Sequence, residues 1–433
     1  MNASKALLEM LKNYDVEHVF GLPGETTLPL YKEWLDFPEI KHVMARDERS
    51  SAFMADGYAR FTNKPGVCEA PSVGSTHILP GVAEAYKASL PVIFMTSDIP
   101  LHMETRNMLT GLDQTSMFSG ITKETYTVTN PDQIPHTIRR AFRVATTGKP
   151  GPVHIRLPYD MLQGEIVDPD LYAQKDFSKY PGHRPVAETE KIVEALKLLG
   201  EAEKPVIVAG QGALYSQACD ELISIAEMFA APVGTTINAK GVMPEMHPLS
   251  LGVIGARGGT SLSNRILCEA DLIFFVGSST DSAGTDKWTV PSVDTDAKII
   301  QLDISEHEAG NNYPVDVILI GDAKATLQWM LELANISPRE MEKLPRIQAL
   351  IKAKEEHSAY VAGLMSSKEK PIHPSGSSRS YRMRSPRNGA SSWMWALAPS
   401  TPRRSTRYPR PEGQWRTTSP WAASATPYRQ VWA

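Results

Sequence analysis

Cysteine is scarce in this chain of 433 residues, which contains only Cys68, Cys219 and Cys268. Their odd number and wide separation exclude a disulfide framework and a Cys-x-x-Cys metal knuckle. The 11 histidines form no HExxH motif and no other paired ligand spacing. The sequence therefore predicts reduced thiols and gives no reason to expect a metal site built from protein ligands.

Long apolar runs and a strong net charge are also missing. No segment approaches the roughly 18 uninterrupted apolar residues that a membrane helix needs. Lys5, Glu9 and Lys12 interrupt the apolar positions of the first segment, which is typical of an amphipathic helix. The formal net charge of -4 argues against a nucleic-acid-binding or membrane-surface protein. We therefore expect a cytoplasmic protein that binds neither nucleic acid nor a membrane.

Strand-like and helix-like segments alternate through residues 1–165. Helical periodicity marks residues 26–35, 50–60 and 77–88. Apolar segments between the helices indicate strands, in the order HVF, IKHVMA, GVCEA, PVIFMTS and GPVHIRLP. This alternation predicts an α/β domain with a doubly wound parallel sheet.

A second domain with the same alternation is predicted for residues 189–335. Residues 166–188 are polar, contain proline and are interpreted as a linker. Five strand candidates follow in the second domain: PVIVAGQG, PVGTTI, DLIFFVG, KIIQLDI and VDVILIGD. They predict a second parallel sheet of Rossmann-like type. Residues 336–370 are predicted to form a helical linker.

The composition changes abruptly at about residue 371. Residues 371–433 contain ten Arg, no Lys, no Asp, one Glu and five of the eight Trp, without helix or strand periodicity. They are predicted to be a disordered basic tail, and their composition resembles a coding region that is read out of frame. The alternative is a basic, aromatic arm that binds nucleic acid, but no other segment of the sequence has features typical of nucleic-acid binding.

Three loops are expected at one edge of the first sheet. They are GLPGE after the first strand, ARDE after the second and PSVGST after the third. Because ligands of parallel sheets bind outside the carboxyl ends of the strands, these loops are expected to line one pocket. Glu48 ends the second loop and starts a helix, whose dipole favours a carboxylate there. It is either a ligand-binding acid or a first-turn acid paired with Arg46 or Arg49.

The segments VFGLPGETTLPL, HVMARDERSSAFMADGYAR, GVCEAPSVGSTHILPGVAEAY and LDQTSMF resemble the pyrimidine-binding domain of thiamine-diphosphate enzymes of the acetolactate synthase and 2-oxoacid decarboxylase group. KPVIVAGQGA and IIQLDISEHEAGNN are similar to the central domain of that family. The resemblance covers about residues 1–330. It implies a thiamine-diphosphate-dependent lyase or carboligase that acts on pyruvate or another 2-oxoacid.

The resemblance implies roles for individual residues. Glu48 corresponds to the catalytic glutamate that donates a hydrogen bond to ring nitrogen N1′ of the aminopyrimidine. Asp47 and His77 stand where acetolactate synthases usually have His and Asn, which leaves the substrate open. Six residues correspond to cofactor-binding positions: Pro23, Gly24, Ser72, Gly74, His77 and Gln114.

A third family domain, which binds the diphosphate through Mg²⁺, has no counterpart in this sequence. Its Gly-Asp-Gly motif is absent, and the only Asn pair, Asn311 and Asn312, lies in the second domain. The resemblance therefore predicts either a homo-oligomer or a partner chain with a diphosphate-binding domain. The alternative class is a non-catalytic or half-site protein.

FAD is an optional second cofactor in this interpretation. The GQGA segment with Gly210 and Gly212, and the GARGG segment at 255–259, match a flavin site only loosely. A nucleotide-binding or flavin-binding module of Rossmann type is the third interpretation of the chain.

Overall fold

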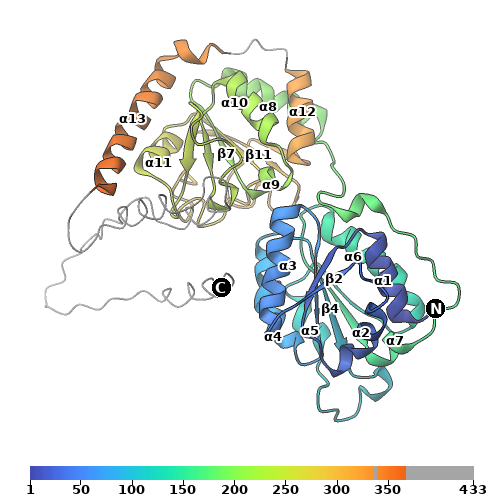
Figure 1. The fold of residues 1–433 in the computed structure, drawn as a ribbon. Coiled ribbons are helices and arrows are strands. Elements are labelled where there is room, and N and C mark those ends of the chain that lie inside the picture. The colour runs from blue at the N-terminus through green and yellow to red at the C-terminus, as the bar shows by residue number, and fades with distance from the viewer. Residues whose placement is uncertain (335–338, 367–433) are drawn as a thin grey trace. The chain divides into compact units, whose positions relative to one another are not determined.

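The computed structural model describes residues 1–334 and 339–366. They contain two separate parallel sheets of six strands each, formed within residues 18–158 and 205–320 (Figure 1). The predicted α/β class with two parallel-sheet domains is confirmed. The predicted disordered tail, 371–433, lies outside the described residues, and the domain boundaries given above stay predictions.

The first sheet has the strand order β2-β1-β3-β4-β6-β5, and all neighbouring strands are parallel. Its strands are β1 (His18–Gly21), β2 (Lys41–Met44), β3 (Gly66–Ala70), β4 (Val92–Asp98), β5 (Glu124–Thr127) and β6 (Val153–Pro158). Strands β3, β4 and β6 are buried along their whole length, as strands of a parallel sheet covered on both faces should be. Strand β5 was not predicted, because this half-buried edge strand has the polar sequence ETYT.

Helices cover both faces of the first sheet (Figure 1). The helices are α1 (Ala3–Asn13), α2 (Leu28–Trp34), α3 (Glu48–Thr62), α4 (Ser75–Lys87), α5 (Gln114–Ser119), α6 (Ile134–Thr146) and α7 (Tyr159–Gln163). Apolar side chains of α1, α2, α6 and α7 share one core, and those of α3, α4 and α5 share the other. The predicted helices 50–60 and 77–88 match α3 and α4. The predicted helix 26–35 is split into the 3₁₀ turn η1 (Glu25–Thr27) and α2.

The second sheet has the order β12-β11-β10-β7-β8-β9 and is also entirely parallel. Its strands are β7 (Pro205–Ala209), β8 (Val233–Thr235), β9 (Ser250–Val253), β10 (Leu272–Val276), β11 (Lys298–Asp303) and β12 (Val317–Ile320). Strand β9 was not predicted. It is short, contains Gly252 with φ of +73° and pairs with β8 through a register shift, so its sequence lacks a strand pattern.

The helices of the second domain are α8 (Thr189–Glu201), α9 (Gln211–Tyr215), α10 (Cys219–Phe229), α11 (Ser261–Cys268) and α12 (Ala323–Leu333). Helix α13 (Pro345–Met365) lies within the predicted helical linker. The remaining 3₁₀ turns are η2 (Leu101–Met103), η3 (Pro131–Gln133), η4 (Lys175–Ser178), η5 (Ile237–Ala239) and η6 (Met341–Lys343).

Within residues 1–334 and 339–366, no helix has both the length and the apolar character that crossing a bilayer requires. The same residues contain no group of three or more His, Cys, Asp or Glu side chains arranged to hold a metal ion. The three cysteines are free thiols, so no disulfide links the described elements.

Candidate functional site

The loops that follow β1 and β3 are in direct contact at the carboxyl edge of the first sheet. The backbone N–H of Ser72 donates a hydrogen bond to Oγ1 of Thr26 over 3.1 Å. Gly24 lies so close to Pro71 that a Cβ on the glycine would be 2.5 Å from the Pro71 Cβ. The sequence placed these loops at one edge, and the structure brings them into contact.

Glu48 is the first residue of α3 and faces these loops from the end of β2. The residue is only 9% exposed. Its Oε2 lies 2.8 Å from Nδ1 of His77, and its Oε1 faces Gly74, where an added Cβ would be 2.6 Å away. Glu48 is therefore held in a crevice beside the PSVGST loop and does not form the expected surface pair with Arg49.

Arg49 pairs with Asp47 instead, which is the N-cap of α3. The Asp47 carboxylate accepts a hydrogen bond from the backbone N–H of Arg49 at 2.8 Å and lies 3.2 Å from its guanidinium. Desolvation acts to raise the pKa of Asp47, but the hydrogen bonds and charge of Arg49 outweigh it and lower this pKa below its ordinary value. Asp47 thus caps α3 and pairs with Arg49. Glu48 instead contacts His77.

Gly74 lets Glu48 Oε1 lie against the backbone of the PSVGST loop, because a side chain there would collide with that oxygen and with Pro71. Gly74 has ordinary right-handed helical backbone angles, with φ of -58° and ψ of -21°. Glycine is thus needed there for room and not for its conformational freedom. A carboxyl group beside a bare stretch of backbone can hold a ring nitrogen while the ring lies against the chain.

We expect Gly74→Ala to weaken binding of an aminopyrimidine ring about 10-fold or more, since the new methyl group must displace Glu48 Oε1. The free energy of unfolding should fall by only about 1–3 kcal/mol, the usual cost of overpacking. Gly57→Ala is the matched control, because nothing lies within 4 Å of its added Cβ in the middle of α3. This control should bind the ring as wild type does, and its unfolding free energy should rise by about 0.5–1 kcal/mol. Thiamine titration measures the binding, and urea denaturation measures the unfolding free energy.

The other predicted site residues are placed differently. Ser72 is buried, and its Oγ lies 3.0 Å from Asp98 Oδ1 and also contacts the Thr110 carbonyl. Gln114 is fully buried, with Nε2 donating to the Ser97 carbonyl at 3.0 Å and Oε1 accepting from Thr96. Pro23 and His77 are exposed. The cofactor-binding roles of these residues stay predictions, and the Gln114 amide is occupied by β4 in this structure.

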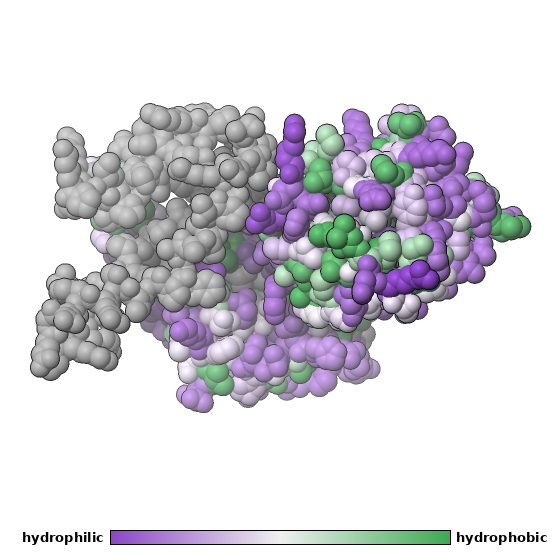
Figure 2. All heavy atoms as spheres, turned by 90° about the horizontal axis from the view of Figure 1, so that it is seen from below, coloured by the Kyte–Doolittle hydropathy of each residue, from purple (hydrophilic) through white to green (hydrophobic). Residues whose placement is uncertain are grey.

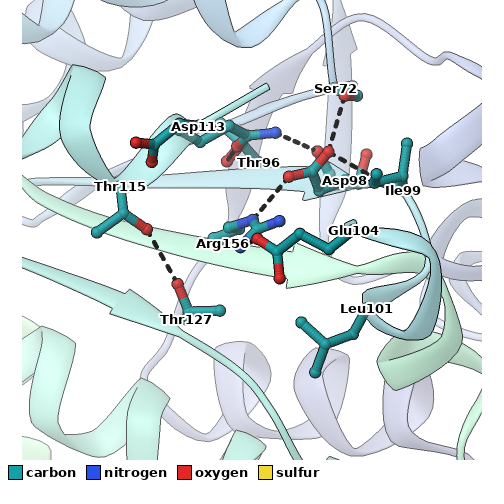
Figure 3. Close-up of polar contacts among 12 residues, drawn as sticks. Ser72, Thr96, Asp98, Ile99, Leu101, Glu104, Asp113, Thr115, Thr127 and Arg156 are labelled. Atoms are coloured by element: carbon teal, nitrogen blue, oxygen red, sulfur yellow. Dashed lines mark hydrogen bonds and ion pairs between the residues drawn. The ribbon is translucent and has the colours of Figure 1, made fainter. Parts of the chain in front are cut away.

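A buried charge network beneath the site was missed by the sequence interpretation (Figure 3). Asp98 is 0% exposed and Arg156 5%. Arg156 Nε lies 2.6 Å from Asp98 Oδ2, and its Nη1 lies 2.8 Å from Glu104 Oε1. The network joins β4, β6 and the loop after β4, and through Ser72 it reaches the PSVGST loop. The sequence contained one signal for this network, which is Arg156 inside the buried strand VHIRLP. A buried charge requires a partner of opposite charge.

His154 supports the same region from β6. Its ring stacks on Phe118 with centroids 3.8 Å apart, and its Nε2 lies 2.7 Å from Thr96 Oγ1, the hydroxyl that also holds Gln114. Burial, with a smaller effect from the Arg156 charge, lowers the pKa of His154 to about 3. His154 is therefore neutral at pH 7.

This depressed pKa predicts acid destabilisation. An unfolded histidine binds its proton near pH 6.5, whereas the folded His154 does so only near pH 3, so the folded state loses stability as pH falls between these values. From pH 6.5 to 4.5 the loss should be about 2–3 kcal/mol. His154→Gln should remove this part of the pH dependence, so the gap in unfolding free energy between wild type and variant should narrow as pH falls. A gap that stays constant in urea denaturation series would contradict the prediction.

The GQGA segment, which matched a flavin site only loosely, follows β7 at the carboxyl edge of the second sheet. Gly210 packs against Gly277, whose carbonyl oxygen would be 2.2 Å from a Cβ on Gly210, so this glycine serves close backbone packing. A cavity of about 150 Å³ lies at this edge, and Asp281, Asp303 and Asp322 are among its lining residues. Burial raises the pKa of Asp303 to about 6. Lys87 and Lys149 line the same cavity, so its wall contains charges of both signs.

The Asn pair of the second domain has a structural role. Asn312 Nδ2 lies 3.1 Å from the Ser279 carbonyl and 3.0 Å from Thr280 Oγ1, so it ties down the loop after β10. This contact agrees with the interpretation that the pair is not part of a diphosphate site.

The chain has two parallel-sheet domains, and a buried glutamate follows the second strand of the first domain. This arrangement is typical of enzyme domains that bind a cofactor. Residues 1–117 match the family model "Thiamine pyrophosphate enzyme, N-terminal TPP binding domain", and residues 192–330 match "Thiamine pyrophosphate enzyme, central domain". Together the two models cover more than half of the chain. The chain belongs to the thiamine pyrophosphate enzyme family.

Curated relatives agree with this assignment. A probable acetolactate synthase large subunit of Methanocaldococcus jannaschii is 38% identical over 336 residues, which are 76% of this chain and 56% of the relative. The acetolactate synthase large subunit of Corynebacterium glutamicum is 34% identical, over 79% of this chain and 54% of the relative. A probable 2-ketoarginine decarboxylase, AruI, of Pseudomonas aeruginosa is 34% identical, over 82% of this chain and 62% of the relative. The chain thus spans little more than half the length of these relatives.

Proposed function

We propose that this chain forms the pyrimidine half of a thiamine-diphosphate site in an acetolactate-synthase-like lyase or carboligase that acts on pyruvate or another 2-oxoacid. The observation that carries the proposal is the buried carboxyl of Glu48, whose Oε1 lies against Gly74 of the PSVGST loop. When bound, thiamine diphosphate supplies the electron sink that loss of carbon dioxide from a 2-oxoacid requires.

Each residue of the crevice has a distinct task in this proposal. Glu48 holds a proton at a carboxyl oxygen and donates it in a hydrogen bond to the ring nitrogen. Gly74 lets Glu48 lie against the backbone, Gly24 lets its loop pack on Pro71, and Pro23 shapes the turn beside it. The positive end of the α3 dipole stabilises negative charge on Glu48 when its proton is shared.

A second candidate function is a half-site protein that needs another chain for the diphosphate and its Mg²⁺. Three exposed apolar side chains on segments that follow or end β1, β2 and β3 favour a covering chain: Leu28, Met44 and Val73 are 55%, 61% and 46% exposed. Figure 2 shows patches of apolar residues among hydrophilic ones on one face of the molecule. The cover would come from a second copy of this chain or from a partner with a diphosphate-binding domain.

Two groups of relatives bear on the 2-oxoacid. They are acetolactate synthases and a probable 2-ketoarginine decarboxylase. Both names support a 2-oxoacid as the substrate class. FAD has only the resemblance to support it, and no step of the proposal uses it.

Calorimetric titration of the full chain with thiamine diphosphate and Mg²⁺, followed by an assay of carbon dioxide release from pyruvate, tests the proposal. Binding and turnover by the chain alone support the enzyme. Binding that appears only after addition of a chain with a diphosphate-binding domain supports the half-site protein. A yellow protein that ignores thiamine diphosphate would contradict both candidates and favour a flavin-binding module.

A further inference from the structure

The two carboxyl oxygens of Glu48 have different surroundings. Oε2 lies 2.8 Å from Nδ1 of His77, whereas Oε1 faces Gly74. Gly74 is the N-cap of α4, and His77 lies in the first turn of that helix, so one helix start supplies both contacts. The Glu48 side chain is 12% exposed, whereas that of His77 is 56% exposed. His77 therefore approaches the buried carboxyl from the solvent side.

A hydrogen bond to only one carboxyl oxygen fixes the orientation of the group. The last side-chain torsion of glutamate has a broad, roughly two-fold energy profile. This torsion by itself therefore orients the carboxyl group only weakly. With Oε2 accepting from the imidazole N–H, Oε1 is the oxygen left to carry a proton toward the crevice. A neutral imidazole with its proton on Nδ1 suffices for this contact.

Asp47, the acid next to Glu48 in sequence, forms its hydrogen bonds with Arg49 through the backbone and the guanidinium. The charge of His77 also helps to lower the pKa of Asp47, after the larger effects of Arg49. His77 makes its hydrogen-bond contact with Glu48.

We propose that His77 is a positioning residue, which holds Oε2 of Glu48 so that Oε1 stays at Gly74, where the proposed function places the ring nitrogen. The inference rests on the proposed function, because it concerns the same carboxyl. It assigns His77 a contact with the protein, whereas the family resemblance suggested a contact with the cofactor.

The geometry of the hydrogen bond provides a sharp test. Nδ2 of an asparagine can occupy the position of a histidine Nδ1, because both nitrogens are one bond beyond Cγ, whereas the amide nitrogen of glutamine lies one bond farther out. Asn at position 77 should therefore replace the contact, and Gln or Leu should not. Since His77 is half exposed, all three variants should fold, as their thermal unfolding midpoints would verify.

Thiamine, which has the aminopyrimidine ring without the diphosphate, is the probe, titrated into the full chain by NMR. We expect His77→Leu and His77→Gln to raise its dissociation constant about 10-fold, and His77→Asn to leave it within about 3-fold of wild type. Equal affinities for the Asn and Gln variants, or wild-type affinity for the Leu variant, would overturn the inference.

Glu48→Ala separates the inference from the proposed function. If this variant loses thiamine binding while His77→Leu keeps it, only the role of His77 is wrong. If wild type binds no thiamine, or binds it as well as Glu48→Ala does, the proposed function fails and the inference fails with it.

Discussion

Replacing Glu48 by Gln is expected to slow exchange of the thiazolium C2 proton of bound thiamine diphosphate by about 10²–10⁴-fold, the usual contribution of a positioned acid–base group. An amide of the same shape keeps the crevice filled and the contact with His77 possible, but it cannot release a proton to the ring nitrogen. The measurement is proton–deuterium exchange followed by NMR, with saturating thiamine diphosphate and Mg²⁺. The full chain is used, together with a diphosphate-binding partner if binding requires one.

Glu25→Gln is the matched control for this prediction. Glu25 is an acid on the loop after β1 at the same edge of the sheet, but it is exposed. An exposed substitution of this kind changes free energies by about 0.5 kcal/mol or less, so exchange should stay within about 2-fold of wild type. Exchange by the Glu48 variant at the wild-type rate would contradict the assignment of Glu48 as the catalytic acid.

Asp98→Asn is expected to lower the free energy of unfolding by about 3–5 kcal/mol, because it leaves the buried guanidinium of Arg156 without its buried counter-charge. The two side chains are 2.6 Å apart, and neither is more than 6% exposed. The same change should loosen the PSVGST loop, since Ser72 Oγ loses a charged acceptor. Urea denaturation monitored by circular dichroism measures the loss.

Glu104→Gln serves as the control for the charge network. Glu104 contacts the same guanidinium at 2.8 Å, but its side chain is 49% exposed. Ion pairs in contact with solvent contribute only about 0–1 kcal/mol, so this variant should unfold almost as wild type does. An equally large loss from both substitutions would show that burial does not decide the strength of the Asp98 contact.

Strands with unbroken apolar runs were predictable from the sequence, and strands without them were not. The PVIFMTS run corresponds to β4, which lies inside a sheet that is covered on both faces, and the mainly apolar GPVHIRLP segment, which also contains His154 and Arg156, corresponds to β6. Strand β5 is polar and half-buried, and β9 contains a glycine at positive φ. Pairing with a neighbouring strand makes these two segments strands, and pairing is not visible in a single segment.

The candidate site was predictable in its location and not in its contacts. Residue order alone places Glu48 at a strand end and a helix start, next to the loops that contain Gly24 and Gly74. One of the two interpretations paired Glu48 with Arg46 or Arg49, but its partner is His77, which is 29 residues away. Gln114 was expected near the reacting centre, whereas its amide is bound by Thr96 and the Ser97 carbonyl on β4.

By itself the amino-acid sequence determined that this protein has two parallel α/β domains and that an acid follows the second strand of the first domain. Hydrophobic periodicity and the order of strands and loops are properties of residues that are adjacent in the chain. They can therefore be recognised in the sequence alone. Only the tertiary structure decided which oxygen of Glu48 faces Gly74, and that Asp98 and Arg156 neutralise each other beneath the site. Those contacts join residues from different strands and helices, and their strength depends on burial, which arises only when the sheet and its helices pack together.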